Sequence, residues 1–189
     1  MELDLMRLFE GYVRNYHTLK LTTYHGKHFF TMSEIHYFSA LGSMLGYHPF
    51  TEDTCDGTYR PMDLTWWGGY KNDYWHDFVL HMERENLYAK DKETLDKLFA
   101  EREYRPVNTI GIMNVKDSKR IEELLHYART AHTIERSLLI FRTKSIHDDH
   151  PFLDEVHAFV VNQNHVSASK KASVSDIGGT LFMHFDKEG

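Results

Sequence analysis

The chain has 189 residues, which is enough for one domain with a hydrophobic core and too few for two full-sized domains. Apolar residues make up 41% and charged residues 26%, as in ordinary globular proteins, and no apolar run is long enough to cross a membrane. The net charge of −6 argues against a protein that coats nucleic acid by neutralising phosphates. It leaves room for an enzyme that acts on nucleic acid through an acidic site.

The cysteine content and the N-terminal residues indicate a compartment. The single cysteine, Cys55, excludes an intrachain disulfide and a cysteine-based zinc site. The N-terminal segment contains early acidic residues and lacks the cationic stretch of a signal peptide. We therefore expect a cytoplasmic protein with no membrane partner.

The first elements in chain order are a helix over 2–16, a β-like segment over 19–31 that Gly26 interrupts, and a helix over 32–46. Apolar residues in both helical segments recur at the three- and four-residue spacing of an amphipathic helix. Gly46 is typical of the residue that follows a last helical turn.

Three strands are expected next, over 47–53, 59–67 and 75–85, with the segment GGYKNDY (68–74) as a loop. The links between them are short enough for hairpins. Hairpins join antiparallel strands, so these three strands are expected to be antiparallel neighbours in one sheet.

Helices and strands alternate in the second half of the chain. The pattern predicts a helix over 91–103 with Asp91 as its N-cap, a buried strand over 107–115, a helix over 117–131 and a strand over 136–144. Helices between strands indicate a sheet with helices packed on its faces, and the hairpins before them make the sheet mixed.

The tail is expected to hold two further strands, near 155–162 and 180–185, around a loop rich in serine and lysine. The whole chain, 1–189, is therefore predicted to form a single α/β domain. Its parts are a core over about 32–143, an N-terminal extension with a helix and a β-like segment over 1–31, and a β-rich C-terminal extension over 144–189.

Four carboxylates occupy positions that could bring them together. Glu34 lies in the second predicted helix, Asp63 in the second strand, and Glu83 and Glu85 near the end of the third. Adjacent strands lie about 4.8 Å apart and alternate residues share a face, so the three strand carboxylates could project to one side. Carboxylates that close repel one another unless a cation lies between them.

This order of elements and acids resembles the PD-(D/E)XK nucleases, which have the restriction-endonuclease-like fold. The residues that carry the resemblance are Glu34, Pro61-Met62-Asp63 and Glu83-Arg84-Glu85. The resemblance implies metal-dependent hydrolysis of phosphodiesters in nucleic acid, with DNA as the expected substrate. It makes Asp63, Glu83 and Glu85 ligands of Mg²⁺ or Mn²⁺, with Glu34 holding a water bound to the metal.

The sequence departs from the family's pattern in two ways. One extra residue separates the proline from the aspartate, and Glu85 stands where the family has its lysine. Glu85 could bind a second metal or act as general base, or Lys92 or Lys97 of the following helix could replace the lysine. A second register, His81-Met82-Glu83, would instead place Glu83 at the lysine position.

Each of these acids also has a structural interpretation. Thr31 and Glu34 have the spacing of a helix capping box, and Glu83 and Glu85 could be solvated at a strand end. Asp63 is harder to explain in this way because strand interiors disfavour aspartate. The alternatives to an active nuclease are a nuclease-like fold that lost catalysis and serves binding or assembly, and an unrelated α/β protein.

Four other features of the sequence are weaker indications of a functional site than these carboxylates. HDDH (147–150) has metal-binding residue types, but consecutive side chains diverge, so a surface turn is favoured. YHGKH (24–28) favours a hairpin turn over a phosphate contact. The aromatic residues within 66–75 could stack on unpaired bases, pack a loop or form a homodimer surface. Lys170-Lys171 favours a solvated loop over a phosphate contact.

Overall fold

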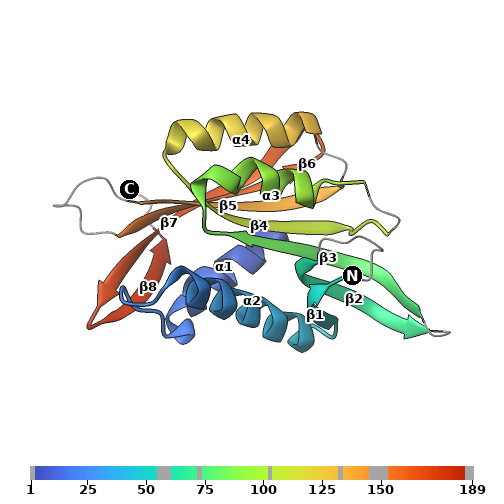
Figure 1. Ribbon diagram of the computed structural model, residues 1–189, viewed down its shortest axis with the longest axis horizontal. Coiled ribbons are helices and arrows are strands. Elements are labelled where there is room, and N and C mark those ends of the chain that lie inside the picture. The colour runs from blue at the N-terminus through green and yellow to red at the C-terminus, as the bar shows by residue number, and fades with distance from the viewer. Residues whose placement is uncertain are drawn as a thin grey trace.

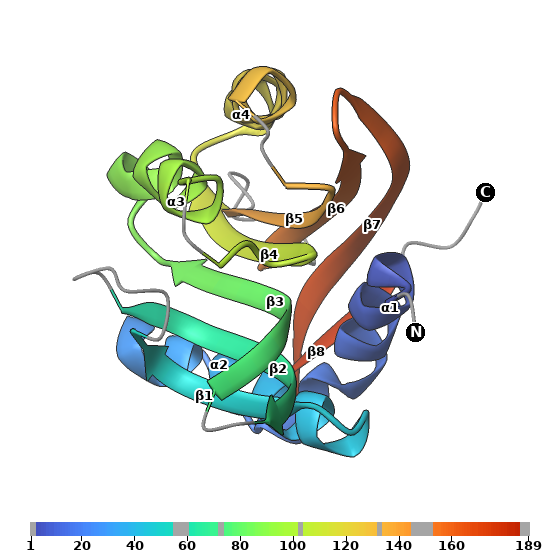
Figure 2. The ribbon, with the colours of Figure 1, turned by 90° about the vertical axis from the view of Figure 1, so that its right-hand side faces the viewer.

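The computed structural model describes residues 3–54, 61–71, 74–101, 104–131, 134–144 and 153–185. These residues form one mixed β-sheet with helices on both faces (Figure 1, Figure 2), so the predicted α/β class is confirmed. Cys55 and the HDDH motif (147–150) lie outside the described residues. In the described ranges, no helix combines the length and the apolarity needed to span a membrane.

Four α-helices and two short 3-10 helices are present among the described residues. They are α1 (Leu5–Asn15), η1 (Tyr16–Leu19), α2 (Lys27–Met44), η2 (Tyr88–Lys90), α3 (Asp91–Leu98) and α4 (Ser118–Ala131). The strands are β1 (His48–Asp53), β2 (Met62–Lys71), β3 (Tyr74–Glu85), β4 (Asn108–Val115), β5 (Arg136–Lys144), β6 (Asp154–Asn162), β7 (His165–Ile177) and β8 (Thr180–Phe185).

The eight strands lie in the sheet in the order in which they occur in the chain. Strands β3, β4 and β5 are parallel, and every other neighbouring pair is antiparallel. Parallel neighbours need a crossover, and α3 and α4 supply the two that are required. The predicted antiparallel arrangement of the first three strands is confirmed.

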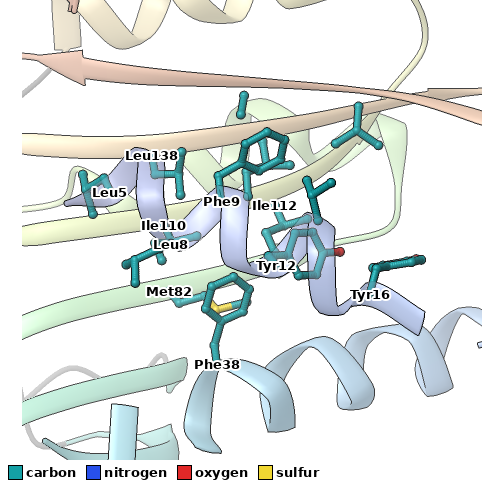
Figure 3. Close-up of a cluster of buried hydrophobic side chains, with 14 of the residues drawn as sticks. Leu5, Leu8, Phe9, Tyr12, Tyr16, Phe38, Met82, Ile110, Ile112 and Leu138 are labelled. Carbon is teal, nitrogen blue, oxygen red and sulfur yellow. The ribbon is translucent and has the colours of Figure 1, made fainter. Parts of the chain in front are cut away.

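Two hydrophobic cores lie on opposite faces of the sheet. Helices α1 and α2 cover one face, where Phe9, Tyr12 and Phe38 pack against strand residues such as Met82 and Ile110 (Figure 3). Helices α3 and α4 cover the other face through a second set of buried side chains. Each large apolar side chain that is fully buried in this way contributes roughly 1.5–3 kcal/mol to the stability of the fold.

Alternation along the strands decides which residue faces which core. In β4, Ile110 and Ile112 belong to the core under α1 and α2, whereas Met113 belongs to the core under α3 and α4. A strand that is buried on both sides has a nearly continuous apolar sequence, which explains NTIGIMNV. The same alternation assigns each carboxylate of β2 and β3 to one face.

The predicted β-like segment over 19–31 is wrong. Lys20 adopts a left-handed conformation at the end of η1, and α2 already begins at Lys27, directly after Gly26. The YHGKH segment therefore leads into a helix rather than a hairpin. Thr31 lies inside α2, where its hydroxyl donates to the carbonyl of Lys27. The expected helix end is confirmed, since Gly46 has a φ of +87°.

Two predicted loops are also wrong. Strand β2 continues to Lys71 and β3 starts at Tyr74, so most of GGYKNDY belongs to a long hairpin. The Ser/Lys-rich segment is strand β7, which pairs with β6 and β8. In both segments the strand is held by main-chain hydrogen bonds to its neighbours, which polar side chains do not prevent.

Helix α3 is shorter than predicted and differs at its start. It ends at Leu98, and Asp91 is its first residue rather than its N-cap. The Asp91 carboxylate instead pairs with Arg120 of α4 at 2.7 Å. The inward-facing Leu95, Leu98 and Phe99 are buried as expected.

Candidate active site

Asp63 and Glu83 lie side by side on β2 and β3. Leu64 pairs with Met82, so the next residues along the ladder, Asp63 and Glu83, stand opposite each other. The Arg84 N–H donates to Asp63 Oδ2 at 2.7 Å, and the Asp63 N–H lies 3.4 Å from Glu83 Oε1. Leu64 and Met82 face the core under α1 and α2, so Asp63 and Glu83 project toward α3.

The surroundings of Asp63 disfavour the ionised form of its carboxyl group. Burial, followed by the nearby Glu83 carboxylate, raises the pKa of Asp63 to about 6. The hydrogen bond from the Arg84 N–H and the charge of Lys97 act in the opposite direction but do not offset burial. A cation beside this pair of carboxylates would relieve the cost.

Glu83 has two close partners on the α3 side of the sheet. Lys97 Nζ lies 2.6 Å from Glu83 Oε2, and His81 Nε2 lies 2.6 Å from Glu83 Oε1. Lys92 instead lies over the ring of Tyr127, at 4.6 Å from its centroid. Of the two helix lysines considered as substitutes for the family's lysine, Lys97 is the one that reaches the carboxylates.

A small polar pocket of about 200 Å³ opens over this pair. Its lining residues are Asp63, Glu83, Arg84, Glu85, Lys90, Glu93, Thr94 and Lys97. Glu85 therefore joins the group, although its Oε1 also accepts a hydrogen bond from the Leu87 N–H at 2.7 Å. The pocket lies at the carboxyl end of β3, where open α/β sheets commonly bind ligands.

Glu34 is not part of this group, which corrects the predicted site. It projects from α2 onto the opposite face and is fully buried. Its carboxylate accepts hydrogen bonds from Tyr12 Oη at 2.6 Å, from an Arg142 nitrogen at 2.8 Å and from Arg84 Nε. It can neither hold a water beside Asp63 nor form the capping box with Thr31.

The buried charges around Glu34 compensate one another. Burial alone would raise the pKa of Glu34, but the guanidinium groups of Arg84 and Arg142 outweigh it and hold the pKa below its ordinary value. Arg142 also pairs with Asp154 at 2.7 Å and donates a hydrogen bond to Tyr16 Oη at 3.0 Å. This network is a structural ion-pair cluster with its charges satisfied.

The donor set of the Asp63 site suits a hard divalent cation. In the described part of the chain, no three His, Cys, Asp or Glu side chains are arranged to hold a metal ion. Mg²⁺, however, is commonly held by one or two carboxylates while waters and substrate phosphates complete its shell. The facing carboxylates and the raised pKa of Asp63 fit such an ion.

His81, Arg84 and Arg142 contact the acidic residues described above, and none of the three was among the predicted site residues. His81 lies two positions before Glu83, and this spacing in a strand predicts a shared face. Arg142 follows the apolar run LLIF in a strand, and a charged residue there signals a buried partner. The partner itself, Glu34, is distant in the chain and carries no sequence signal of the pairing.

No family model matches this chain. Nor does any curated protein match it.

Proposed function

We propose that the chain is a divergent PD-(D/E)XK-type nuclease that hydrolyses phosphodiesters of nucleic acid with Mg²⁺ or Mn²⁺. The observation that carries the proposal is the grouping of Asp63, Glu83 and Lys97. Two facing carboxylates with a lysine ammonium 2.6 Å from one of them supply the residue types that the resemblance requires.

The order of elements also supports this proposal. Helix α2 is followed by the antiparallel strands β1, β2 and β3, then by α3 and by β4 parallel to β3. The resemblance implies such an order, with its acids on the second and third strands. Asp63 lies on β2 and Glu83 on β3, as that order requires.

Each side chain has a defined task in the proposed reaction. A bound Mg²⁺ or Mn²⁺ would make the attacking water more acidic and neutralise charge on the phosphate. Asp63 and Glu83 provide the anionic oxygens, and the Arg84 N–H fixes the Asp63 carboxylate. Lys97 orients the attacking water and stabilises the negative charge that develops on it.

Glu85 occupies the family's lysine position but does not supply a positive charge. One of its oxygens is engaged by the Leu87 N–H, and the side chain lines the pocket. Its second oxygen can accept the proton of the attacking water as a general base. Lys97, which lies in the next helix, α3, supplies the positive charge of the family's lysine instead.

A second candidate is a nuclease-like fold that binds nucleic acid without cutting it. The observation in its favour is that Glu83 already has two partners, Lys97 and His81, each at 2.6 Å. A carboxylate that remains engaged in this way is a weaker ligand for a cation. The two candidates make different predictions in the presence of a divalent cation: the first cleaves nucleic acid, and the second only binds it.

The test measures nicking of supercoiled plasmid and cutting of single-stranded DNA with Mg²⁺ or Mn²⁺. We expect Asp63→Asn, Glu83→Gln and Lys97→Met each to lower the rate by at least 100-fold, since catalytic groups of these types contribute about 10²–10⁴-fold. Glu122→Gln and Lys119→Met, on the exposed side of α4, are matched controls and should leave the rate unchanged.

The outcomes separate the two candidates. Equal cleavage by wild type and all three site variants would identify a contaminating nuclease and remove the enzymatic proposal. DNA binding without cleavage by the wild type, measured as a gel shift, would favour the binding protein instead.

A further inference from the structure

A larger pocket lies on the other face of the sheet. It has a volume of about 430 Å³ and opens at the carboxyl ends of the parallel strands β3, β4 and β5. Its lining residues are Thr23, His25, Lys27, Phe30, Arg84, Asn86, Tyr88, Asn114, Arg142, Lys144, Leu153, Asp154, Val174 and Leu181. This volume lies within the range of sites that bind small organic ligands.

The described lining of this pocket has an excess of positive charge. Lys27, Arg84, Arg142 and Lys144 contribute four positive charges, and Asp154 contributes one negative charge. Glu34, which pairs with both arginines from beneath, is the second negative charge. Two positive charges are therefore left without a compensating carboxylate among the residues that the structure describes.

The two lysines are the side chains that carry this excess. Arg84 and Arg142 are engaged by Glu34 and Asp154, whereas Lys27 and Lys144 have no carboxylate partner in the described ranges. Both lysines are exposed at the rim. The buried arginines lie at the floor of the pocket, and the two exposed lysines lie at its rim.

The other lining residues supply polar amide groups and an apolar wall. Asn114 Oδ1 accepts from the Arg84 guanidinium at 3.3 Å, and the Asn114 amide nitrogen donates to the main-chain carbonyl of Asn86 at 3.3 Å. These bonds fix the polar side of the pocket. Phe30, Leu153 and Leu181 form an apolar side. A ligand with one anionic group and one flat organic group would match both parts of the lining.

We propose that this pocket binds a phosphate monoester joined to an organic group such as a nucleoside. A phosphate monoester carries a charge of about −2 at neutral pH, which matches the excess of two positive charges among the described lining residues once Glu34 is counted. Its three terminal oxygens accept from lysine ammonium and guanidinium donors. The proposal uses residues of the α2 face and does not depend on the proposed hydrolysis at Asp63.

The test is calorimetric titration of the full chain, in EDTA, with adenosine 5′-monophosphate, and with adenosine as the unphosphorylated control. We expect the monophosphate to bind and adenosine to bind at least tenfold more weakly. The double variant Lys27→Gln Lys144→Gln should weaken monophosphate binding by at least tenfold. Because both side chains are exposed, this variant should keep the thermal unfolding midpoint of the wild type.

The matched control removes two exposed lysines elsewhere. Lys71 lies at the hairpin end of β2, remote from the pocket, and Lys119 lies on α4 on the opposite face. The Lys71→Gln Lys119→Gln variant loses the same charge and should bind like the wild type. It therefore distinguishes specific binding in this pocket from a general effect of net charge.

A second arm identifies the source of the phosphate. It compares a short single-stranded DNA carrying a 5′-phosphate with the same strand lacking it. If the phosphorylated strand binds more tightly and Lys27→Gln Lys144→Gln abolishes this difference, the pocket binds strand ends. If only the monophosphate binds, the pocket binds a free small molecule. Equal binding with and without phosphate in both pairs, or equal binding by wild type and the pocket variant, overturns the proposal.

Discussion

Asp63 and Glu34 are both acidic residues inside the protein, and their surroundings act on them in opposite directions. Burial and the neighbouring Glu83 raise the pKa of Asp63 to about 6, whereas two guanidinium groups hold the pKa of Glu34 low despite its complete burial. The ionised form of Asp63 therefore costs free energy in the folded state. Glu34 is ionised because its charge is matched by Arg84 and Arg142.

The raised pKa of Asp63 predicts that Asp63→Asn stabilises the fold at neutral pH. The folded state holds the Asp63 proton up to about pH 6, while the unfolded chain loses it near pH 4, so ionisation destabilises the fold as pH rises through this window. Removing the charge should increase the free energy of unfolding at pH 7.5 by up to about 3 kcal/mol. Asparagine can still accept from the Arg84 N–H.

Urea denaturation at pH 4 and at pH 7.5 measures this effect. The gain from Asp63→Asn should be present at pH 7.5 and small at pH 4, where the wild-type carboxyl is protonated in the fold. Glu122→Gln, on the exposed face of α4, serves as the control. A gain of the same size at both pH values would show that the charge of Asp63 is not its cause.

At the scale of elements, helix α2 approaches the sheet very closely at Gly42. Gly42 of α2 packs on the ring of Trp66 in β2, and a Cβ at this position would lie 2.7 Å from two atoms of that ring. The ring is itself fully buried, so it has no free space into which to move. A glycine within this helix is therefore required by packing and not by backbone conformation.

We predict opposite effects for two Gly→Ala substitutions in helices. Gly42→Ala should lower the free energy of unfolding by about 1–3 kcal/mol because it overpacks the contact with Trp66. Gly11→Ala, in α1, places its Cβ 3.6 Å from Tyr37 Oη, which is an ordinary contact. It should stabilise the protein by about 0.5–1 kcal/mol through helix propensity.

Thermal or urea unfolding of both variants provides the comparison. The far-UV circular dichroism of each should match that of the wild type, which excludes a change of fold. Stabilisation by Gly42→Ala would contradict the packing of α2 against β2.

At the scale of the whole molecule, one buried ionic network connects elements from both ends of the chain. Glu34 of α2 contacts Tyr12 of α1, Arg84 of β3 and Arg142 of β5, and Arg142 continues to Asp154 of β6. These contacts fix both N-terminal helices on the middle of the sheet. The predicted core and its N-terminal extension are therefore joined by this network.

Replacing Glu34 by glutamine should destabilise the whole protein. Glutamine has nearly the same shape but leaves Arg142 with Asp154 alone and removes the carboxylate that pairs with Arg84. Breaking a buried ion pair in this way costs about 3–5 kcal/mol. Urea denaturation followed by tryptophan fluorescence and by far-UV circular dichroism should show the loss equally with both probes. A loss below about 1 kcal/mol would mean that the network does not hold α2 on the sheet.

Much of the fold could be predicted from local patterns. The apolar face of α1, the continuous apolar runs of β4 and β5 and the glycine after α2 each satisfy a requirement of a single helix or strand. The proximity of Asp63 and Glu83 was also predicted, because a short link makes β2 and β3 neighbours. Strand β7 was missed because its polar residues gain their order from hydrogen bonds to β6 and β8.

Local sequence patterns predict the α/β class, the elements with clear apolar periodicity and the placement of Asp63 and Glu83 on neighbouring strands. Contacts between distant parts of the chain place α2 on the opposite face, which takes Glu34 away from Asp63. Such contacts also bring Lys97 rather than Lys92 to Glu83. The reason is physical: spacing along a chain defines which side chains share one face of one element. The face on which each helix packs depends on burial and charge pairing between residues far apart in the chain.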